Sequence, residues 1–187
     1  MADLDADPAV EYDAVVYDLD GTLAELAVDW AAVRRDVGRT FETHGVDPGD
    51  RDLWRLLERS RKEPALAEAV EATIAEHERE GARTSARLAS ADRLLAHPAD
   101  LPVGVCSLNC EAACRLALER HELDGRVRAV VGRDTVETEK PDPEPLLATL
   151  RDLGVSPERA VFVGDGERDE VTAERAGTDF RYAEDWG

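Results

Sequence analysis

Two aspartates, Asp18 and Asp20, directly follow the apolar run at 14–17 and precede Gly21 and Thr22. A short run of this type predicts a buried strand that carries acids at its carboxyl end. Alternate residues of an extended chain point the same way, so we expect the two carboxylates to converge on one site. Such a pair could bind a divalent cation, act as a nucleophile with its acid/base partner, or do both.

A hydroxyl group, that of Ser107, follows a second apolar run at 103–106 and precedes a predicted helix that starts near Asn109. A hydroxyl beside the amino end of a helix suits a phosphate, because the free N–H groups and the helix dipole favour an anion there. The plainer alternative is that Ser107 or Asn109 only caps that helix.

Lys140 lies in the proline-rich loop 140–143, and only two of the 23 basic residues of the chain, Lys62 and Lys140, are lysines. A compact ammonium can contact a phosphoryl oxygen and a carboxylate at once, where a planar guanidinium would crowd them. The alternative is a solvated lysine in a loop that its prolines stiffen.

A second pair of acids, Asp165 and Asp169, follows the apolar run at 160–163. Asp165 stands in a glycine-rich turn at the end of this predicted strand and is a candidate metal ligand. Asp169 could hold a metal-bound water or orient Lys140. Alternatively, it only complements the dipole of the helix that begins there.

Five short segments that must position these groups are predicted strands: 14–18, 103–107, 127–131, 160–164 and 179–182. Predicted helices at 109–119, 144–153 and 167–176 lie between or after them. This alternation indicates an α/β fold with a doubly wound, mainly parallel sheet and right-handed crossovers. Ligands of such sheets bind at the carboxyl ends of the strands, where three of the four polar groups stand.

The segment between 27 and 85 has no convincing strand pattern and shows helical periodicity at 29–43, 50–61 and 64–80. A further helix at 86–96 is expected to return to the sheet. We therefore expect three parts: an acidic tail at 1–12, a core domain formed by 13–26 and 86–187, and a small helical cap at 27–85 inserted after the first strand.

The order of these groups along the chain (acid pair, hydroxyl, lysine, acids) resembles that of the haloacid dehalogenase superfamily of phosphohydrolases. The matching residues are Asp18-Leu19-Asp20-Gly21-Thr22, Ser107, Lys140-Pro141, Gly164-Asp165 and Asp169. The stretch Gly132-Arg133-Asp134 ahead of Lys140 resembles the phosphoglycolate phosphatase-like branch. The chain departs from the superfamily in reading Ser-Leu-Asn at 107–109, where many members have Asn directly after the hydroxyl residue. It also stops soon after the fifth predicted strand.

The resemblance implies a phosphatase that uses Mg²⁺ and acts on a small phosphorylated metabolite. It implies metal ligation by Asp18, Asp20 (through its main-chain carbonyl), Asp165 and Asp169. Asp18 would attack phosphorus to form an aspartyl-phosphate, and Asp20 would protonate the leaving oxygen and then activate water.

The remaining residues that the resemblance implies contact the phosphate. They are Gly21, Thr22, Ser107, Asn109 and Lys140, of which Ser107 and Lys140 would also offset charge on the transferring oxygens.

Three other functions fit parts of this pattern. A β-phosphoglucomutase-like phosphomutase would use the same aspartates. A phospho-accepting regulatory domain also combines clustered Asp, a hydroxyl and a Lys, but the helical insertion and the pair Asp165 and Asp169 argue against it. A non-catalytic binding protein on the same scaffold is disfavoured by the complete residue set.

The net charge of −19 argues against nucleic acids and anionic membranes as partners, because both would repel the protein. No apolar run is long enough to span a bilayer, and the acidic start of the chain does not read as a secretory signal. We therefore expect a cytoplasmic monomer or homodimer. Abundant carboxylates with few lysines further predict a halophilic protein.

The three cysteines, Cys106, Cys110 and Cys114, are odd in number and closely spaced, which does not predict a disulfide framework.

Overall fold

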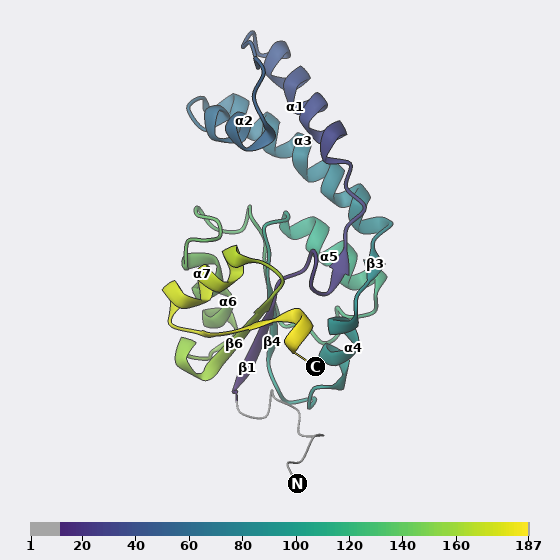
Figure 1. Ribbon diagram of the computed structural model, residues 1–187, viewed down its shortest axis with the longest axis vertical. Coiled ribbons are helices and arrows are strands. Elements are labelled where there is room, and N and C mark those ends of the chain that lie inside the picture. The colour runs from purple at the N-terminus through teal and green to yellow at the C-terminus, as the bar shows by residue number, and fades with distance from the viewer. Residues whose placement is uncertain (1–11, 187) are drawn as a thin grey trace.

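The computed structural model describes residues 12–186 (Figure 1). The acidic tail predicted for 1–12 therefore lies outside the described residues, except for Tyr12. The described chain consists of a sheet body and a separate group of three helices, which stands above the sheet body in Figure 1.

The sheet body is built on five strands: β1 (Ala14–Tyr17), β4 (Val103–Cys106), β5 (Ala129–Val131), β6 (Ala160–Gly164) and β7 (Asp179–Tyr182). They lie in the order β5-β4-β1-β6-β7, and every neighbouring pair is parallel. β1 is central, with Val16 opposite Gly104 on one side and Phe162 on the other. This order places the ends of β4 and β6 beside the end of β1.

Helices cover both faces of the sheet. They are α4 (Ala89–Ala96) and α5 (Glu111–Arg120) on one face, and α6 (Glu144–Leu153) and α7 (Glu167–Ala176) on the other. Val15 packs in the apolar cluster that includes Cys114 of α5, whereas its neighbour Val16 packs in the cluster that includes Leu146 of α6. Burial on both faces explains why β1 is a continuous apolar run rather than an alternating one. The predicted doubly wound α/β fold is confirmed.

The three helices of the insertion are α1 (Trp30–Thr43), α2 (Leu53–Ser60) and α3 (Pro64–Arg83). They enclose an apolar cluster of their own, in which Phe41, Leu56 and Val70 are fully buried. The side chains of Asp29 and Asp52 cap the first two helices.

Two short strands, β2 (Ala24–Glu25) and β3 (Ala86–Arg87), pair antiparallel where the chain enters and leaves the three-helix unit. The predicted helix at 86–96 is therefore wrong at its start, because Ala86 and Arg87 pair with β2 and α4 begins at Ala89. A two-residue strand shows no periodicity, so local sequence could not reveal it.

The end of the described chain packs against the face of the sheet that α4 and α5 cover. Two short turns of 3₁₀ helix, Pro157–Arg159 and Ala183–Asp185, precede β6 and follow β7. Trp186 is buried, and its Nε1 donates to the Tyr17 hydroxyl at 2.8 Å. Cys106, Cys110 and Cys114 are free thiols and all three are buried. Among residues 12–186, no helix is both long and apolar enough to cross a membrane.

Candidate active site

Three strand ends deliver the acids and the hydroxyl to one edge of the sheet. The N–H of Asp18 donates to the Val163 carbonyl of β6 at 2.8 Å, and the N–H of Ser107 donates to the Val131 carbonyl of β5 at 3.0 Å. These bonds continue the ladders of the sheet by one residue, so the side chains that follow are held by the backbone of their neighbours.

The carboxylates of Asp18, Asp165 and Asp169 form a compact acidic cluster. Each offers an oxygen that lies within 4.8 Å of the other two. Asp18 Oδ1 is buried, and the ammonium of Lys140 lies 3.0 Å from it. Oxygen ligands at this separation fit the coordination that Mg²⁺ takes in proteins.

Two glycines make room for these acids. Gly21 has φ +82°, and a Cβ added to it would lie 2.2 Å from Asp165 Oδ2. A Cβ on Gly164 would lie 2.5 Å from Asp169 Oδ2. Any side chain at either position would displace a carboxylate of the cluster, so the geometry of the site requires both glycines.

Lys140 is the cation at the centre of this cluster. Its Nζ lies 3.0 Å from Asp18 Oδ1 and 2.5 Å from Asp169 Oδ1, and it donates to the Cys106 carbonyl at 3.2 Å. Burial disfavours the ammonium, but the charges of Asp18 and Asp169 outweigh it and raise the pKa of Lys140 above its usual value. Lys140 is therefore a fixed positive charge, and the solvated-lysine alternative is wrong.

For the acids, burial raises the pKa, because it disfavours the charged carboxylate. It raises the pKa of Asp18 to about 7, although the nearby ammonium of Lys140 lowers it. Burial also raises the pKa of Asp20, whose Oδ1 accepts a hydrogen bond of 2.8 Å from the Leu26 N–H. This bond orients the Asp20 carboxyl from the segment that leads into the three-helix unit.

Ser107 and Asn109 are buried and hydrogen-bonded to each other, with Ser107 Oγ donating to Asn109 Oδ1 at 3.1 Å. Neither caps α5, whose N-cap is Cys110. The N–H groups there donate instead to Glu78 and Asp134, so the capping alternative is wrong. Both polar side chains are left facing the cavity described next.

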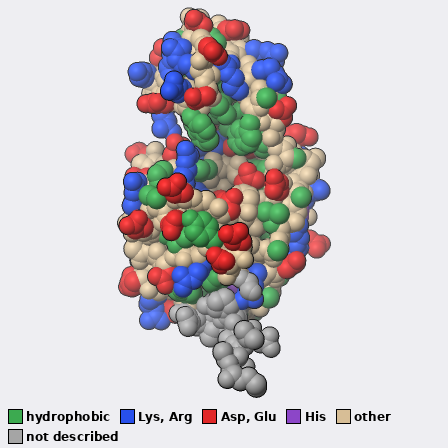
Figure 2. Space-filling view, viewed as in Figure 1, with side chains coloured by type: hydrophobic (Ala, Val, Ile, Leu, Met, Phe, Trp, Pro, Cys, Tyr) green, Lys and Arg blue, Asp and Glu red, His purple; other side chains and the backbone are tan. Residues whose placement is uncertain are grey.

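A cavity of about 350 Å³ lies between the strand ends and the three-helix unit. Figure 2 shows the hollow between the two parts, with hydrophobic side chains gathered on the wall formed by the helices. All but two of the predicted site residues line it: Asp18, Asp20, Ser107, Asn109, Lys140, Asp165 and Asp169. Gly21 and Thr22 do not; they lie in the tight turn behind Asp20, where the Thr22 N–H donates to the Leu19 carbonyl.

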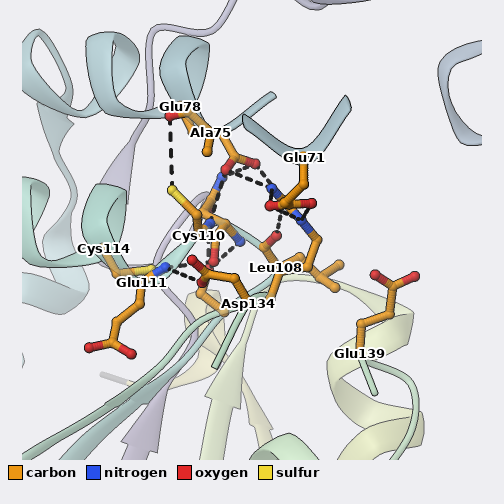
Figure 3. Close-up of polar contacts among 12 residues, drawn as sticks. Glu71, Ala75, Glu78, Leu108, Cys110, Glu111, Cys114, Asp134 and Glu139 are labelled. Atoms are coloured by element: carbon orange, nitrogen blue, oxygen red, sulfur yellow. Dashed lines mark hydrogen bonds and ion pairs between the residues drawn. The ribbon is translucent and has the colours of Figure 1, made fainter. Parts of the chain in front are cut away.

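An ion-pair network that the sequence pattern did not predict lies at the rim of this cavity. Arg133, just after β5, donates to Glu78 Oε1 and Glu71 Oε1, each at 2.6 Å. Figure 3 shows both carboxylates extending from α3 toward Leu108. Glu78 is 1% exposed and also accepts from the Cys110 N–H at 2.9 Å. The network therefore joins the three-helix unit to the loop that carries Ser107.

One signal could have identified Glu78. It continues the i, i+4 spacing of Val70 and Ile74 along the buried stripe of α3. This spacing predicts that the Glu78 side chain faces the protein interior. The helix is otherwise rich in charged residues, which masks this position.

Comparison with known proteins gives the same family throughout. The family model described as haloacid dehalogenase-like hydrolase matches residues 15–183. The chain is 34% identical over 191 aligned positions to a phosphoglycolate phosphatase of Rhodospirillum rubrum, covering 88% of this chain and 76% of that protein. It is 29% identical over 180 positions to the N-acetylmuramic acid 6-phosphate phosphatase of Pseudomonas aeruginosa, covering 88% and 78%.

Solved structures share the fold. A haloacid dehalogenase-superfamily hydrolase from Geobacter sulfurreducens has a TM-score of 0.60 and 28% identity, with 89% of this chain and 86% of that one covered. CbbY from Rhodobacter sphaeroides, solved in complex with phosphate, has a TM-score of 0.64 and 25% identity, with 91% and 85% covered.

Proposed function

Because this chain belongs to the haloacid dehalogenase-like hydrolase family and is a phosphatase similar to phosphoglycolate phosphatases, we propose that it hydrolyses a small phosphorylated metabolite through an aspartyl-phosphate on Asp18. One observation carries the proposal. Asp18, Ser107, Lys140 and Asp165, which are far apart in sequence, line a single cavity.

We assign a Mg²⁺ ion to the acidic cluster. It would be held by the carboxylates of Asp18, Asp165 and Asp169 and by the main-chain carbonyl of Asp20. When bound, it would neutralise phosphate charge that otherwise repels a carboxylate nucleophile. The separation of the three carboxylates supports this assignment.

In the first step, an oxygen of Asp18 attacks phosphorus, and the bond from phosphorus to the ester oxygen breaks. Asp20 gives its proton to the departing oxygen. Its raised pKa favours this role, because a general acid must still hold its proton at the working pH. In the second step, Asp20 takes a proton from water, the water oxygen attacks phosphorus, and Asp18 is released with free phosphate.

Three side chains would bind the phosphoryl oxygens during both steps. Lys140 supplies a permanent charge, while Ser107 and Asn109 supply neutral donors from the loop after β4. Because their positions are set by the sheet and by buried hydrogen bonds, little reorganisation is needed as charge develops on these oxygens.

We further propose that residues 27–85 act as a cap over this cavity and that 13–26 with 86–187 form the catalytic core. The cap supplies the apolar wall that includes Leu57 and Ile74. Such a wall excludes water and selects the leaving group. A cytoplasmic location, a monomeric or homodimeric state and adaptation to high salt complete the proposal.

The test is hydrolysis of p-nitrophenyl phosphate with and without Mg²⁺. We expect turnover that EDTA abolishes and Mg²⁺ restores, and a loss of at least about 100-fold in Asp18→Asn, because a covalent nucleophile contributes orders of magnitude. The exposed Asp124→Asn is the matched control and should keep wild-type activity. More than about one per cent residual activity in Asp18→Asn, with an intact fold, would contradict the nucleophile assignment.

A further inference from the structure

Three cationic side chains line the cavity within the described residues: Arg133, Lys140 and Arg168. Two of them are already neutralised. Lys140 lies between Asp18 and Asp169. Arg133 is held by two carboxylates of α3, as described above. Neither therefore supplies an unpaired charge for a second anionic group, beyond the phosphoryl group that Lys140 contacts.

Arg168 differs from both. It stands in the first turn of α7 beside Glu167, Asp169 and Glu170, yet it forms no ion pair within residues 12–186. Its guanidinium carbon instead lies 5.0 Å from the centroid of the Trp54 ring, on α2 of the cap. A cation in the first turn of a helix opposes the dipole, so helix stability does not explain an arginine there.

The contact with Trp54 sets the direction of the guanidinium. A ring that covers one face of the guanidinium leaves its N–H groups free at the edge, where they can meet a carboxylate or phosphate with two parallel hydrogen bonds. Trp54 is 52% exposed and lines the same cavity as Asp18. The pair therefore joins α2 to α7 across the cavity that Asp18 also lines.

The other lining residues carry mostly negative charge, so an unpaired arginine has a strong effect on which substrates can bind. Asp20, Asp165 and Glu167 also line the cavity, so an anionic leaving group would meet mostly negative charge. Only a free cation could offset that repulsion.

We propose that Arg168, held by Trp54, is the specificity residue that binds a second anionic group on the leaving side of the substrate. The preferred substrates are accordingly small phosphate esters of acids, with a carboxylate or a second phosphate. This inference rests on the proposed phosphatase function and names its substrate class.

The test compares 2-phosphoglycolate with its amide, which has the same size without the second charge. We expect wild type to have the higher kcat/KM for the acid, and Arg168→Gln to reduce the acid-to-amide ratio by at least about tenfold, the typical effect of one charge-assisted hydrogen bond. Ethylene glycol bisphosphate against the monophosphate shows whether a second phosphate serves as well as a carboxylate.

Three variants control for other causes. Arg55→Gln removes the same charge from the residue next to Trp54, but Arg55 pairs with Asp52 and does not line the cavity, so the ratio should stay at the wild-type value. Trp54→Ala should lower the ratio and Trp54→Phe should largely retain it, because phenylalanine keeps an aromatic face for the guanidinium.

An unchanged ratio in Arg168→Gln, or an equal fall in Arg55→Gln, overturns the proposal. If wild type hydrolyses none of these esters, the phosphatase function fails and the specificity of the cavity is measured by binding alone. The measurement is then calorimetric titration of Asp18→Asn with 2-phosphoglycolate and its amide, in Mg²⁺. Tighter binding of the acid that disappears when Arg168→Gln is added supports the inference, and equal binding of the two ligands contradicts it.

Discussion

Asp18 is buried beside a cation, and its titration should be visible in how the free energy of unfolding depends on pH. Its pKa in the folded chain is raised to about 7 by burial. A raised folded pKa means that the protonated form stabilises the fold at low pH and that this contribution is lost as pH rises toward 7. The metal-free protein should therefore lose stability between about pH 4 and pH 7 on account of this group.

Added Mg²⁺ should reverse that loss, because a carboxylate must be deprotonated to bind a metal. We expect Mg²⁺ to raise the Tm more at pH 8 than at pH 5.5 in wild type. The increment at pH 8 should be much smaller in Asp18→Asn, which lacks a charged ligand. Thermal melts at the two pH values, with and without Mg²⁺, measure it, and an equal increment at both pH values would contradict the prediction.

A substitution at Gly21 tests whether the close approach of its backbone to Asp165 is needed for the site. Gly21→Ala introduces a Cβ at 2.2 Å from Asp165 Oδ2 and forces alanine into φ +82°. Gly45 has φ +71° but no atom within 4 Å of its added Cβ, so Gly45→Ala isolates the backbone strain of about 1–2 kcal/mol. We expect a larger loss of unfolding free energy in Gly21→Ala, together with weaker Mg²⁺ binding by calorimetry. Equal losses and unchanged Mg²⁺ binding would show that Asp165 tolerates displacement.

At the scale of elements, helix α3 does more than enclose the apolar cluster of the cap. Its buried Glu78 accepts hydrogen bonds from Arg133 and from the Cys110 N–H. Among residues 12–186, Glu71 accepts hydrogen bonds from Arg133 only, and its side chain is about one-third exposed. The two glutamates therefore share one partner but differ in burial and in contact with the Ser107 loop.

This difference gives a matched pair of variants. Glu78→Ala removes the buried one of the two carboxylates that pair with Arg133 and leaves the Cys110 N–H without its acceptor, so it should cost at least about 2 kcal/mol, within the usual range for an unsatisfied buried donor. Glu71→Ala should cost about 1 kcal/mol or less, because its side chain is partly solvated. Urea denaturation of both variants measures the gap, and similar costs would mean that Glu78 does not anchor the cap to the core.

The order of elements also shows which patterns the chain reveals locally. The strands β1, β4 and β6 could be predicted from the sequence, because a strand buried on both faces is apolar along its whole length. The pairing of Ala24–Glu25 with Ala86–Arg87 could not be predicted. A two-residue strand shows no periodicity, and the two strands are separated in sequence by the whole three-helix unit.

At the scale of the whole molecule, the net charge of −19 should govern the response to salt. In dilute buffer this charge repels an anionic substrate, and at molar salt the screening length is only about 3 Å. We expect kcat/KM for an anionic phosphate ester to rise with KCl up to molar concentration. Choline chloride at equal ionic strength distinguishes screening from a specific effect of potassium. A flat or falling profile in KCl would contradict the prediction.

The types of the residues and their order along the chain indicated the phosphatase family of this protein and its α/β class. Acids at the ends of apolar runs are local features, and the parallel sheet that such runs build gathers its strand ends at one edge. Seven residues that line the cavity could therefore be named before any contact was known, although Gly21 and Thr22 lie behind the cavity rather than in it.

Only the tertiary structure decided which charged side chains form ion pairs within the protein and which remain unpaired and can bind a ligand. Arg133 and its partner Glu78 are 55 positions apart, and Arg168 meets Trp54 across the boundary of cap and core. The sequence alone identifies neither partner. Each partner depends on how α2 and α3 pack over the sheet, and that packing is set by many weak apolar contacts whose sum has no local signature.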